Sequence, residues 1–483
     1  MPHLPADEDW LASRGIPAPE ARRQIALLRS GTEPPVLGRA AAIGDGICQL
    51  SPMERDRWAR LCRERRPSIG FFVPASGAAT RMFAGLKALL DDPEALGEDS
   101  RVKALLACRA VRRSLEADGK ATGTPTDSVR RLLSPAPEGL DWPSSPKAFL
   151  PFHMADKERI QTAVQAQMQE CCDILGPGGK GTLHCSLSPE HLARESSLRE
   201  DSRAISKTGV CALEFQATEQ DPSTDTLCLG PDGEIARDVA GHPLLRAGGH
   251  GSLLANLART PGELVLVKNI DNIQPRWRLG FVVPWRMALG GIALELRRLG
   301  DALLASQPGT LDEAACAKAF ALQLARAGRK EPLDIAGLRN LADRPLRVCG
   351  MVRNDGAPGG GPFWVEGKGL QIVEQSEVSP DPAQQRILAE ATHFNPVEMA
   401  CCLRRPDGSL HELEAFRDPS RAFLSRKVDP RGVALTVLEH PGLWNGSMGE
   451  WLTVFVEIPP ETFLPAKTVF DLAHPWRQLP EGT

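Results

Sequence analysis

Apolar residues recur along the chain with two different spacings, which predict strands and helices in turn. Continuous apolar runs at 69–73 and 264–267 are typical of strands that are buried in a parallel sheet. Apolar positions with helical spacing predict helices over 156–175, 285–304 and 311–327. Strands separated by helices indicate an α/β fold, in which helices flank both faces of a sheet.

This pattern changes along the chain and predicts three parts. Residues 1–66 predict an N-terminal helical segment with breaks, and its last helix begins with a capping-box pattern after Ser51. Residues 67–345 predict the α/β core, with an insertion at about 95–145. Residues 125–145 at the end of that insertion are rich in Pro, Ser and Gly, so we expect a long surface loop there. Residues 346–483 predict a more β-rich part that extends the sheet, with strands at 346–352, 370–373, 433–438 and 452–458.

Composition narrows the classes of protein that fit this pattern. The chain has 483 residues, 42% of them hydrophobic and 24% charged, as in globular proteins. A net charge of −4 argues against nucleic acid as a partner, because binding to a phosphate backbone needs a basic surface. No apolar run of about 18 residues predicts a membrane span, and the acidic N-terminus is unlike a secretory signal. The 12 cysteines include no C-x-x-C pair, so we expect no zinc site, free thiols and a cytoplasmic protein.

One segment in the first predicted strand-and-helix pair suits the binding of phosphate. An apolar strand at 71–74 leads into small residues, and Arg81 follows at the start of a predicted helix. Small side chains let backbone N–H groups approach an anion, and a helix N-terminus and an arginine both favour negative charge. A turn that serves packing alone can have the same composition, and no Walker-type Gly-Lys-Ser/Thr follows. The small residues are Ser76, Gly77, Ala78, Ala79 and Thr80.

Three later segments contain residues suited to a nucleotide or its counter-ion. Lys147 stands between a proline and an apolar stretch, where a solvated lysine is the alternative interpretation. The Gly-Gly-His-Gly segment at 248–251 either lets the backbone approach a ring or ribose closely or forms a plain turn. Asp271 follows the apolar run at 264–267, where α/β folds bind ligands, and it suits either Mg²⁺ or an Asx turn.

The order of these segments resembles that of the nucleotidyltransferase superfamily, and in particular of the UDP-sugar pyrophosphorylases. Those proteins carry a glycine-rich loop that ends in Gly-Thr-Arg, followed by Pro-Lys, Gly-His-Gly and Val-Asp-Asn. Residues 370–377 (Leu-Gln-Ile-Val-Glu-Gln-Ser-Glu) and 462–472 (Thr-Phe-Leu-Pro-Ala-Lys-Thr-Val-Phe-Asp-Leu) are similar to two further segments of that superfamily. The likeness covers about residues 70–475 in collinear order. Taken whole, the chain resembles an uncharacterised bacterial family of unknown function within or near this superfamily.

The resemblance implies a Rossmann-like, GT-A-like nucleotidyltransferase fold and a role for each matching residue. The small-residue loop would bind the nucleotide phosphates, and the segment around Gly249, His250 and Gly251 would bind the base or ribose. Asp271 would hold Mg²⁺, and Glu374 would contact a sugar hydroxyl. The catalytic cations for the phosphates would be Arg81, Lys147 and Lys467.

Two asparagines are further candidates for the sugar side of such a site. Asn395 and Asn445 stand near aromatic residues, and Asn445 also precedes a glycine. Stacking and hydroxyl hydrogen bonds in such a setting suit a sugar, and an ordinary packed turn is the alternative interpretation.

The reaction implied by the resemblance joins a nucleoside triphosphate, with UTP favoured, to a sugar 1-phosphate and releases pyrophosphate. Two features depart from the superfamily pattern. Ala78 and Ala79 stand where relatives have glycines, and Arg81 and Lys147 are 66 positions apart, whereas the matching residues of relatives are close together. The alternative function is therefore a nucleotide or nucleotide-sugar binding protein without turnover. Neither the base, the sugar nor the oligomeric state follows from the sequence.

Overall fold

The computed structural model describes residues 5–77, 79–117, 123–354, 356, 359–429, 432–478 and 480. The chain forms two compact units that alternate along the sequence. The first unit comprises residues 1–54, 220–265 and 289–458, and the second comprises residues 55–219, 266–288 and 459–483. This division differs from boundaries at 66/67 and 345/346, because distant segments of the chain pair with one another in each unit.

The second unit contains the neighbouring strands β4, β7 and β8, and β11 lies next to β4 in the strand order β11-β4-β7-β8. Strand β4 pairs in parallel with β7, and β7 pairs in parallel with β8. Phe71, Phe72 and Leu183 are buried within this sheet. These strands are β4 (Ile69–Pro74), β7 (Lys180–Ser186), β8 (Ala212–Thr218) and β11 (Leu264–Lys268).

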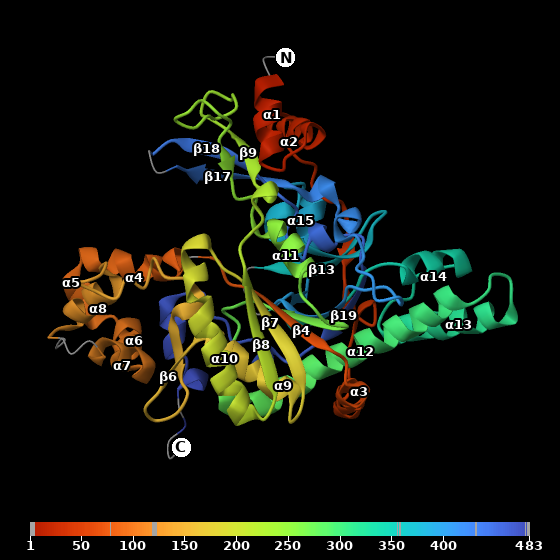
Figure 1. Cartoon of the computed structure of the whole chain (residues 1–483), viewed down its shortest axis with the longest axis horizontal. Helices are drawn as coiled ribbons and strands as arrows, with labels where there is room; N and C mark the ends of the chain where they lie inside the picture. The colour runs from red at the N-terminus through yellow and green to blue at the C-terminus, as the bar shows by residue number, and fades with distance from the viewer. Residues whose placement is uncertain are drawn as a thin grey trace. The chain divides into compact units, whose positions relative to one another are not determined.

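Helices α9 (Ala163–Leu175) and α10 (Glu195–Gly209) pack against this sheet and against each other (Figure 1). Thr162 and Gln165 form a capping box that starts α9, and most of its residues are buried. On α10, the hydroxyl of Ser202 donates a hydrogen bond to the carbonyl oxygen of Leu213 on β8 at 2.7 Å. This hydrogen bond ties α10 to the amino end of β8.

Short helices occupy most of the chain between β4 and β7 (Figure 1, orange). They include a 3₁₀ turn at Thr80–Phe83 and another at Leu89–Asp91, and then the antiparallel strands β5 (Pro151–Met154) and β6 (Ile160–Thr162) follow. The α-helices are α4 (Ala84–Ala88), α5 (Pro93–Glu98), α6 (Ser100–Ala107), α7 (Arg109–Glu116) and α8 (Pro125–Leu133).

Strands of the first unit follow the order β2-β3-β19-β12-β16 within a sheet of ten strands. The β2–β3, β3–β19 and β19–β12 pairs are parallel, whereas β16 and β15 are antiparallel to β12. The mostly parallel α/β architecture that the sequence predicts is therefore confirmed. These strands are β2 (Ala42–Ile43), β3 (Gly46–Cys48), β12 (Leu346–Arg353), β15 (His393–Phe394), β16 (Glu398–Cys402) and β19 (Leu452–Glu457).

Two smaller sheets complete the first unit, in the orders β10-β9-β18-β17 and β1-β13-β14. Helices α1 (Pro5–Ser13) and α2 (Ala18–Ser30) pack on the first of them through an apolar cluster that includes Leu11, Ile25 and Leu227. The strands are β1 (Leu37–Ala40), β9 (Thr226–Leu229), β10 (Leu245–Arg246), β13 (Gly360–Val365), β14 (Gly369–Glu374), β17 (Phe423–Val428) and β18 (Ala434–Glu439).

The remaining helices include one that is long and apolar. Helix α12 (Leu279–Ala305) lies in the one segment of the described residues, 276–305, whose length and hydropathy would allow it to cross a membrane, and 78% of its most apolar window is buried in the structure. The others are α3 (Pro52–Arg65), α11 (Leu254–Ala258), α13 (Leu311–Arg326), α14 (Ile335–Ala342) and α15 (Pro382–Ala389).

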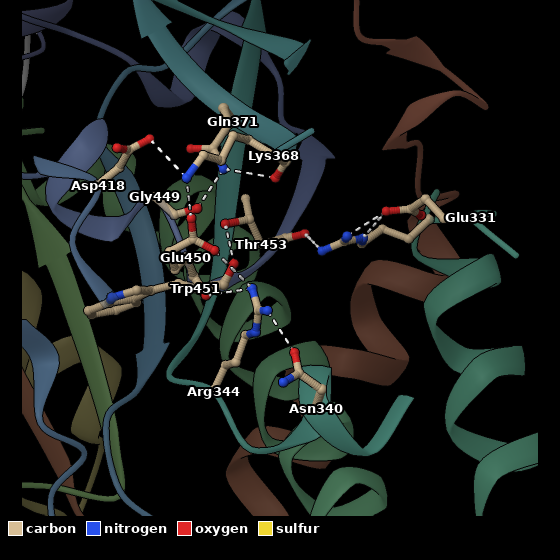
Figure 2. Close-up of polar contacts among 11 residues, drawn as sticks. Glu331, Asn340, Arg344, Lys368, Gln371, Asp418, Gly449, Glu450, Trp451 and Thr453 are labelled. Atoms are coloured by element: carbon tan, nitrogen blue, oxygen red, sulfur yellow. Dashed lines mark hydrogen bonds and ion pairs between the residues drawn. The ribbon is translucent and has the colours of Figure 1, made fainter. Parts of the chain in front are cut away.

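A polar network fixes the turn before β19 in the first unit (Figure 2). Lys368 donates a hydrogen bond to the carboxylate of Glu450 at 2.8 Å, and Arg344 donates one to the Glu450 carbonyl oxygen at 3.1 Å. Arg329 donates a hydrogen bond to the carbonyl oxygen of Thr453 at 3.2 Å. Charged side chains from three loops thus contact the chain at Glu450 and Thr453.

Three local predictions were wrong. Residues 37–48 form strands β1 to β3 rather than helix, because they pair with distant strands such as β13 and β19. Helix α9 begins at Ala163 rather than at 156, since its capping box stands at Thr162. Residues 125–133 form helix α8 instead of a loop, because Thr124 and Asp127 make a capping box and Pro125 occupies the first turn.

Candidate active site

Asp271 stands three residues beyond the end of β11, as the sequence predicts, and is 8% exposed. Its carbonyl oxygen accepts a hydrogen bond from the Ala466 N–H at 3.1 Å. Next to it, the Asn272 side chain accepts one from the Leu464 N–H at 3.1 Å. The chain near its C-terminus therefore lies against the end of β11 like a short added strand.

Two lysines reach the Asp271 carboxylate from different segments of the second unit. Nζ of Lys147 lies 2.8 Å from Oδ2 of Asp271 and 3.0 Å from the carbonyl oxygen of Ala466. Nζ of Lys467 lies 3.6 Å from the same Oδ2, and its side chain is 60% exposed. Three residues that the sequence predicts as catalytic or metal-binding thus form one cluster, and Lys467 presents an ammonium group to solvent.

Opposing effects act on the charge of Asp271. Burial works to raise the pKa of this carboxyl, but the positive charges of Lys467 and Lys147 and their hydrogen bonds outweigh burial, so the pKa lies below its ordinary value. Asp271 is therefore ionised at neutral pH. One carboxylate faces two ammonium groups, which leaves an excess of positive charge that favours an anionic ligand.

The small-residue loop is tied to the segment that carries Lys147. The Ala79 N–H donates to the carbonyl oxygen of Ser145 at 3.0 Å, and the Thr80 hydroxyl donates to that of Pro143 at 3.2 Å. On its other side the loop is anchored to β7, because the Ala75 N–H donates to the Ser186 carbonyl oxygen at 3.1 Å. The loop and Lys147 therefore belong to one connected region of the second unit.

The residues of this loop differ in burial and in whether their backbone N–H groups are already used in hydrogen bonds. Ala79 is fully buried, and its N–H is already used in the hydrogen bond to Ser145. A Cβ added to Gly77 would meet no protein atom within 4 Å, so packing does not require glycine there. Ser76 and Gly77 donate no backbone hydrogen bond within the described part of the chain. Ala78 lies outside the described residues.

Arg81 is exposed and is not part of the ion pair at Asp271. It lies in the 3₁₀ turn Thr80–Phe83, and its side chain has no hydrogen-bond or ion-pair partner among the described residues. The helix that the sequence predicts to start at Arg81 is instead two 3₁₀ turns around the five-residue helix α4. A helix dipole therefore adds little here, and Arg81 itself carries the positive charge of the loop.

The predicted ribose-binding segment lies in the first unit, where close packing accounts for its glycines. A Cβ on Gly251 would lie 2.0 Å from the carbonyl oxygen of Pro441, and one on Gly249 would lie 2.4 Å from a carboxylate oxygen of Glu439. His250 stacks on Trp444 with ring centroids 4.9 Å apart and accepts a hydrogen bond from a backbone N–H. Burial lowers the pKa of His250, so its imidazole is neutral.

The three predicted sugar-binding residues fall into two places in the first unit. Glu374 pairs across β14 and β13 with Gly360, whose carbonyl oxygen accepts a hydrogen bond from the Asn395 N–H at 2.7 Å. A cavity of about 340 Å³ lies beside them, lined by residues that include Phe363. Asn445 lies next to Trp444, and its Oδ1 has no hydrogen-bond partner among the described residues. Their sugar-binding roles stay predictions.

A buried group of charges near β11 was not predicted from the sequence. Nζ of Lys268 lies 2.8 and 2.9 Å from the two carboxylate oxygens of Glu170, and Arg286 donates to the same carboxylate at 2.8 Å. All three side chains are at most 2% exposed. Two sequence signals could have revealed this cluster. One is a lysine at the end of an otherwise apolar strand, and the other is a glutamate in a helix that is otherwise buried.

Arg477 is a second buried cation near the site. It is 2% exposed and donates to the carbonyl oxygen of Ile273 at 3.3 Å. Burial lowers the pKa of Arg477 to about 10, although the charges of Asp471 and Asp271 act in the opposite direction. Arg477 therefore stays charged at neutral pH and adds to the positive potential behind Asp271.

The residues at Asp271 fit a Mg²⁺ ion that a ligand helps to hold. Both lysines approach the Asp271 carboxylate at Oδ2, at 2.8 and 3.6 Å. The described residues contain no group of three or more His, Cys, Asp or Glu side chains that could hold a metal ion by themselves. Mg²⁺ commonly binds through one carboxylate together with substrate phosphates and water, which is the arrangement that Asp271 can supply.

Comparisons with known proteins give one family and a distant structural likeness. No curated protein is similar enough in sequence to count as a relative. Among solved structures, a mutant UDP-glucose pyrophosphorylase from Leishmania major is similar, with a TM-score of 0.41 and 13% sequence identity, over 93% of this chain and 73% of that one. A family model matches residues 5–478, so the chain belongs to the family described as Domain of unknown function (DUF4301).

Proposed function

We propose that the protein is a nucleotidyltransferase that joins a nucleoside triphosphate, with UTP favoured, to a sugar 1-phosphate and releases pyrophosphate. One observation carries the proposal. Lys147 and Lys467, 320 positions apart, both reach the carboxylate of Asp271 beyond β11. Three of the residues matched to the superfamily from motifs alone thus contact one another.

The chemistry of this reaction suits such a cluster. A phosphate oxygen of the sugar 1-phosphate attacks the α-phosphorus of the triphosphate, the bond to the β-phosphate oxygen breaks, and pyrophosphate departs. Because the attacking phosphate is already ionised, the reaction needs no nucleophilic side chain and no general base. It needs alignment and positive charge where negative charge accumulates.

Each residue has a part in this proposal. Lys467, whose ammonium group is exposed, contacts the phosphate of the sugar substrate. Lys147 is fixed by Asp271 and the Ala466 carbonyl oxygen, so it is oriented before a ligand arrives. Arg81 and the N–H groups of Ser76 and Gly77 bind the phosphates that leave. Mg²⁺ held by Asp271 would neutralise charge on the triphosphate.

Release of pyrophosphate tests the proposal. Protein supplied with Mg²⁺, UTP and a panel of sugar 1-phosphates should release pyrophosphate when the correct sugar is present. Asp271→Asn and Lys467→Met should each reduce the rate by at least about 100-fold, in line with the loss of one charge-stabilising group. Lys207→Met, at an exposed lysine of α10, is the matched control and should keep full activity. Turnover that survives Asp271→Asn would exclude this site.

A second candidate function is binding of a nucleotide or nucleotide sugar without turnover. It is favoured by Ala79, because its buried N–H is already bonded to Ser145 and cannot bind phosphate. In that case UTP should raise the melting temperature, Lys147→Met should remove this effect, and no substrate pair should release pyrophosphate.

A further inference from the structure

A second pocket lies in the second unit at the opposite ends of β4 and β7. It is a cavity of about 660 Å³ between the end of α3 and the turn that joins α9 to β7. Ile69 and Lys180, which line it, are the first residues of β4 and β7, whereas the small-residue loop follows the last residue of β4. Six residues of strand span roughly 20 Å, so this amino-end pocket is separate from the cluster at Asp271.

The rim of the amino-end pocket is basic. Arg63, Arg66 and Lys180 line it, and all three are exposed. Their side chains make no hydrogen bond or ion pair with any residue that the structure describes. Asp173, a carboxylate that lines the pocket, accepts a hydrogen bond from Gln169 at 2.8 Å. The three cations outnumber the one engaged carboxylate among the charged side chains of the pocket, and this excess of positive charge favours an anion.

The floor of the pocket is apolar. Cys62, Ile69, Ile174 and Met287 line it and are each at most 6% exposed. A small inorganic anion would leave this floor uncovered, whereas a ligand with a ring or other apolar body would cover it. The volume falls within the range of about 300–1,000 Å³ that is usual for sites of small organic ligands.

The backbone around the pocket leaves room for such a ligand. Gly176 and Gly178 in the turn before β7 have φ angles of 65° and 73°, and a Cβ at either position would meet no protein atom within 4 Å. A neighbouring cavity of about 290 Å³ shares Arg63, Asp173 and Gly176 with the pocket and continues to the first turns of α12. A ligand longer than the main cavity could extend into it.

We propose that the amino-end pocket binds a phosphate monoester that carries a ring body, such as a nucleoside monophosphate. Arg63 and Lys180 contact the phosphate, because a planar guanidinium and an ammonium group both suit it, and the ring lies on the apolar floor. This site is independent of the proposed transferase reaction, since it shares no residue with the cluster at Asp271.

The experiment uses the full chain with Lys147→Met and Lys467→Met, so that binding at Asp271 does not contribute. Titration with AMP should show one site per chain. Adding Arg63→Met and Lys180→Met should weaken AMP binding by at least about tenfold, because two charged contacts are lost. Arg60→Met, at an exposed arginine of α3 that lines neither cavity, is the matched control and should leave AMP binding unchanged.

Two further probes separate the parts of the proposal. Adenosine, which lacks the charge, and inorganic phosphate, which lacks the ring, should each bind at least about tenfold more weakly than AMP. Inorganic phosphate that binds as tightly as AMP would overturn the role of the apolar floor. The absence of AMP binding would overturn the site itself. The same holds if Arg63→Met and Lys180→Met leave AMP binding unchanged in a variant with normal thermal unfolding.

Discussion

Nζ of Lys147 lies 2.8 Å from Oδ2 of Asp271, although 124 positions separate the two residues in the sequence. The Lys147 side chain is 19% exposed and that of Asp271 is 11% exposed, so water screens their interaction only in part. Lys147 also donates to the Ala466 carbonyl oxygen and so joins the end of β11 to the segment that carries Lys467. The pair therefore anchors the backbone next to Lys467, whose side chain is 60% exposed.

Removing either partner of this pair should destabilise the second unit. We expect Lys147→Met to lower the free energy of unfolding by about 1–3 kcal/mol, because Asp271 and the Ala466 carbonyl oxygen then lose a buried donor. Asp271→Asn should lower the free energy of unfolding by a similar amount. The loss of free energy of unfolding in the double variant should be smaller than the sum of the two single losses by roughly 0.5–3 kcal/mol, because the two groups contact each other directly. Urea unfolding at pH 7 measures all three, and strict additivity would contradict the interaction.

Substitution by alanine at two glycines of the predicted nucleotide site should have different effects on the free energy of unfolding. Gly77→Ala should change the free energy of unfolding by no more than about 0.5 kcal/mol, because an added Cβ meets no protein atom. Gly251→Ala should destabilise by at least about 1–3 kcal/mol, because its Cβ would lie 2.0 Å from the Pro441 carbonyl oxygen. Thermal unfolding of both variants measures the difference.

Gly77→Ala also tests the phosphate-binding loop. If the backbone of Gly77 faces the triphosphate, a methyl group there should raise the KM for UTP while the melting temperature stays unchanged. An unchanged KM would mean that the ligand does not approach this backbone.

Local periodicity predicts much of the fold. The apolar runs identify β4 and β11 closely, and the strands β12, β14, β18 and β19 lie where short apolar runs predict them. Strands β1 to β3 were missed because they are short and partly exposed, and only pairing with β13 and β19 makes them strands. The alternation of the two units along the chain has no local signal, since it depends on which distant strands pair.

The sequence predicts the part of the candidate site that consists of a polar residue placed just after a buried strand. Asp271 could be identified because a polar residue after a buried strand lies where α/β folds bind ligands. Lys147 was predicted from a two-residue motif, but its contact with Asp271 joins residues 124 positions apart, so no local pattern reveals that contact. Glu170 and Lys268 were missed, because the pairing of a buried glutamate and lysine is a property of the packing between α9 and β11.

The buried charges near β11 predict a large effect of one substitution. Glu170→Gln removes the carboxylate that both Lys268 and Arg286 contact, and leaves two buried cations facing a neutral amide. We expect a loss of about 3–5 kcal/mol in the free energy of unfolding, as is usual when one partner of a buried ion pair is removed. Glu158→Gln, at an exposed position, is the matched control. A loss as small as that of the control would show that the carboxylate is not needed to hold these cations.

The surroundings of His440 in the first unit lead us to expect that the free energy of unfolding depends on pH. Its Nε2 donates to the Thr224 carbonyl oxygen at 2.8 Å, and its Nδ1 lies 3.4 Å from a guanidinium nitrogen of Arg417. Burial and the charge of Arg417 lower the pKa of His440 to about 4, against an ordinary value of 6.5. Protonation would place a second positive charge beside Arg417, so the folded chain keeps this imidazole neutral.

Between pH 6.5 and 4 the unfolded chain binds a proton at His440 that the folded chain does not bind. The stability that this neutral imidazole contributes is therefore fully present above pH 6.5 and falls as the pH drops toward 4, by about 3 kcal/mol in all. Glutamine at this position can donate to Thr224 and accept from Arg417 without titrating. The advantage of the wild type over His440→Gln should accordingly shrink as the pH falls from 7 to 4.5. Unfolding curves of the two proteins at a series of pH values measure this change, and a difference that stays constant would show that His440 does not titrate between the two states.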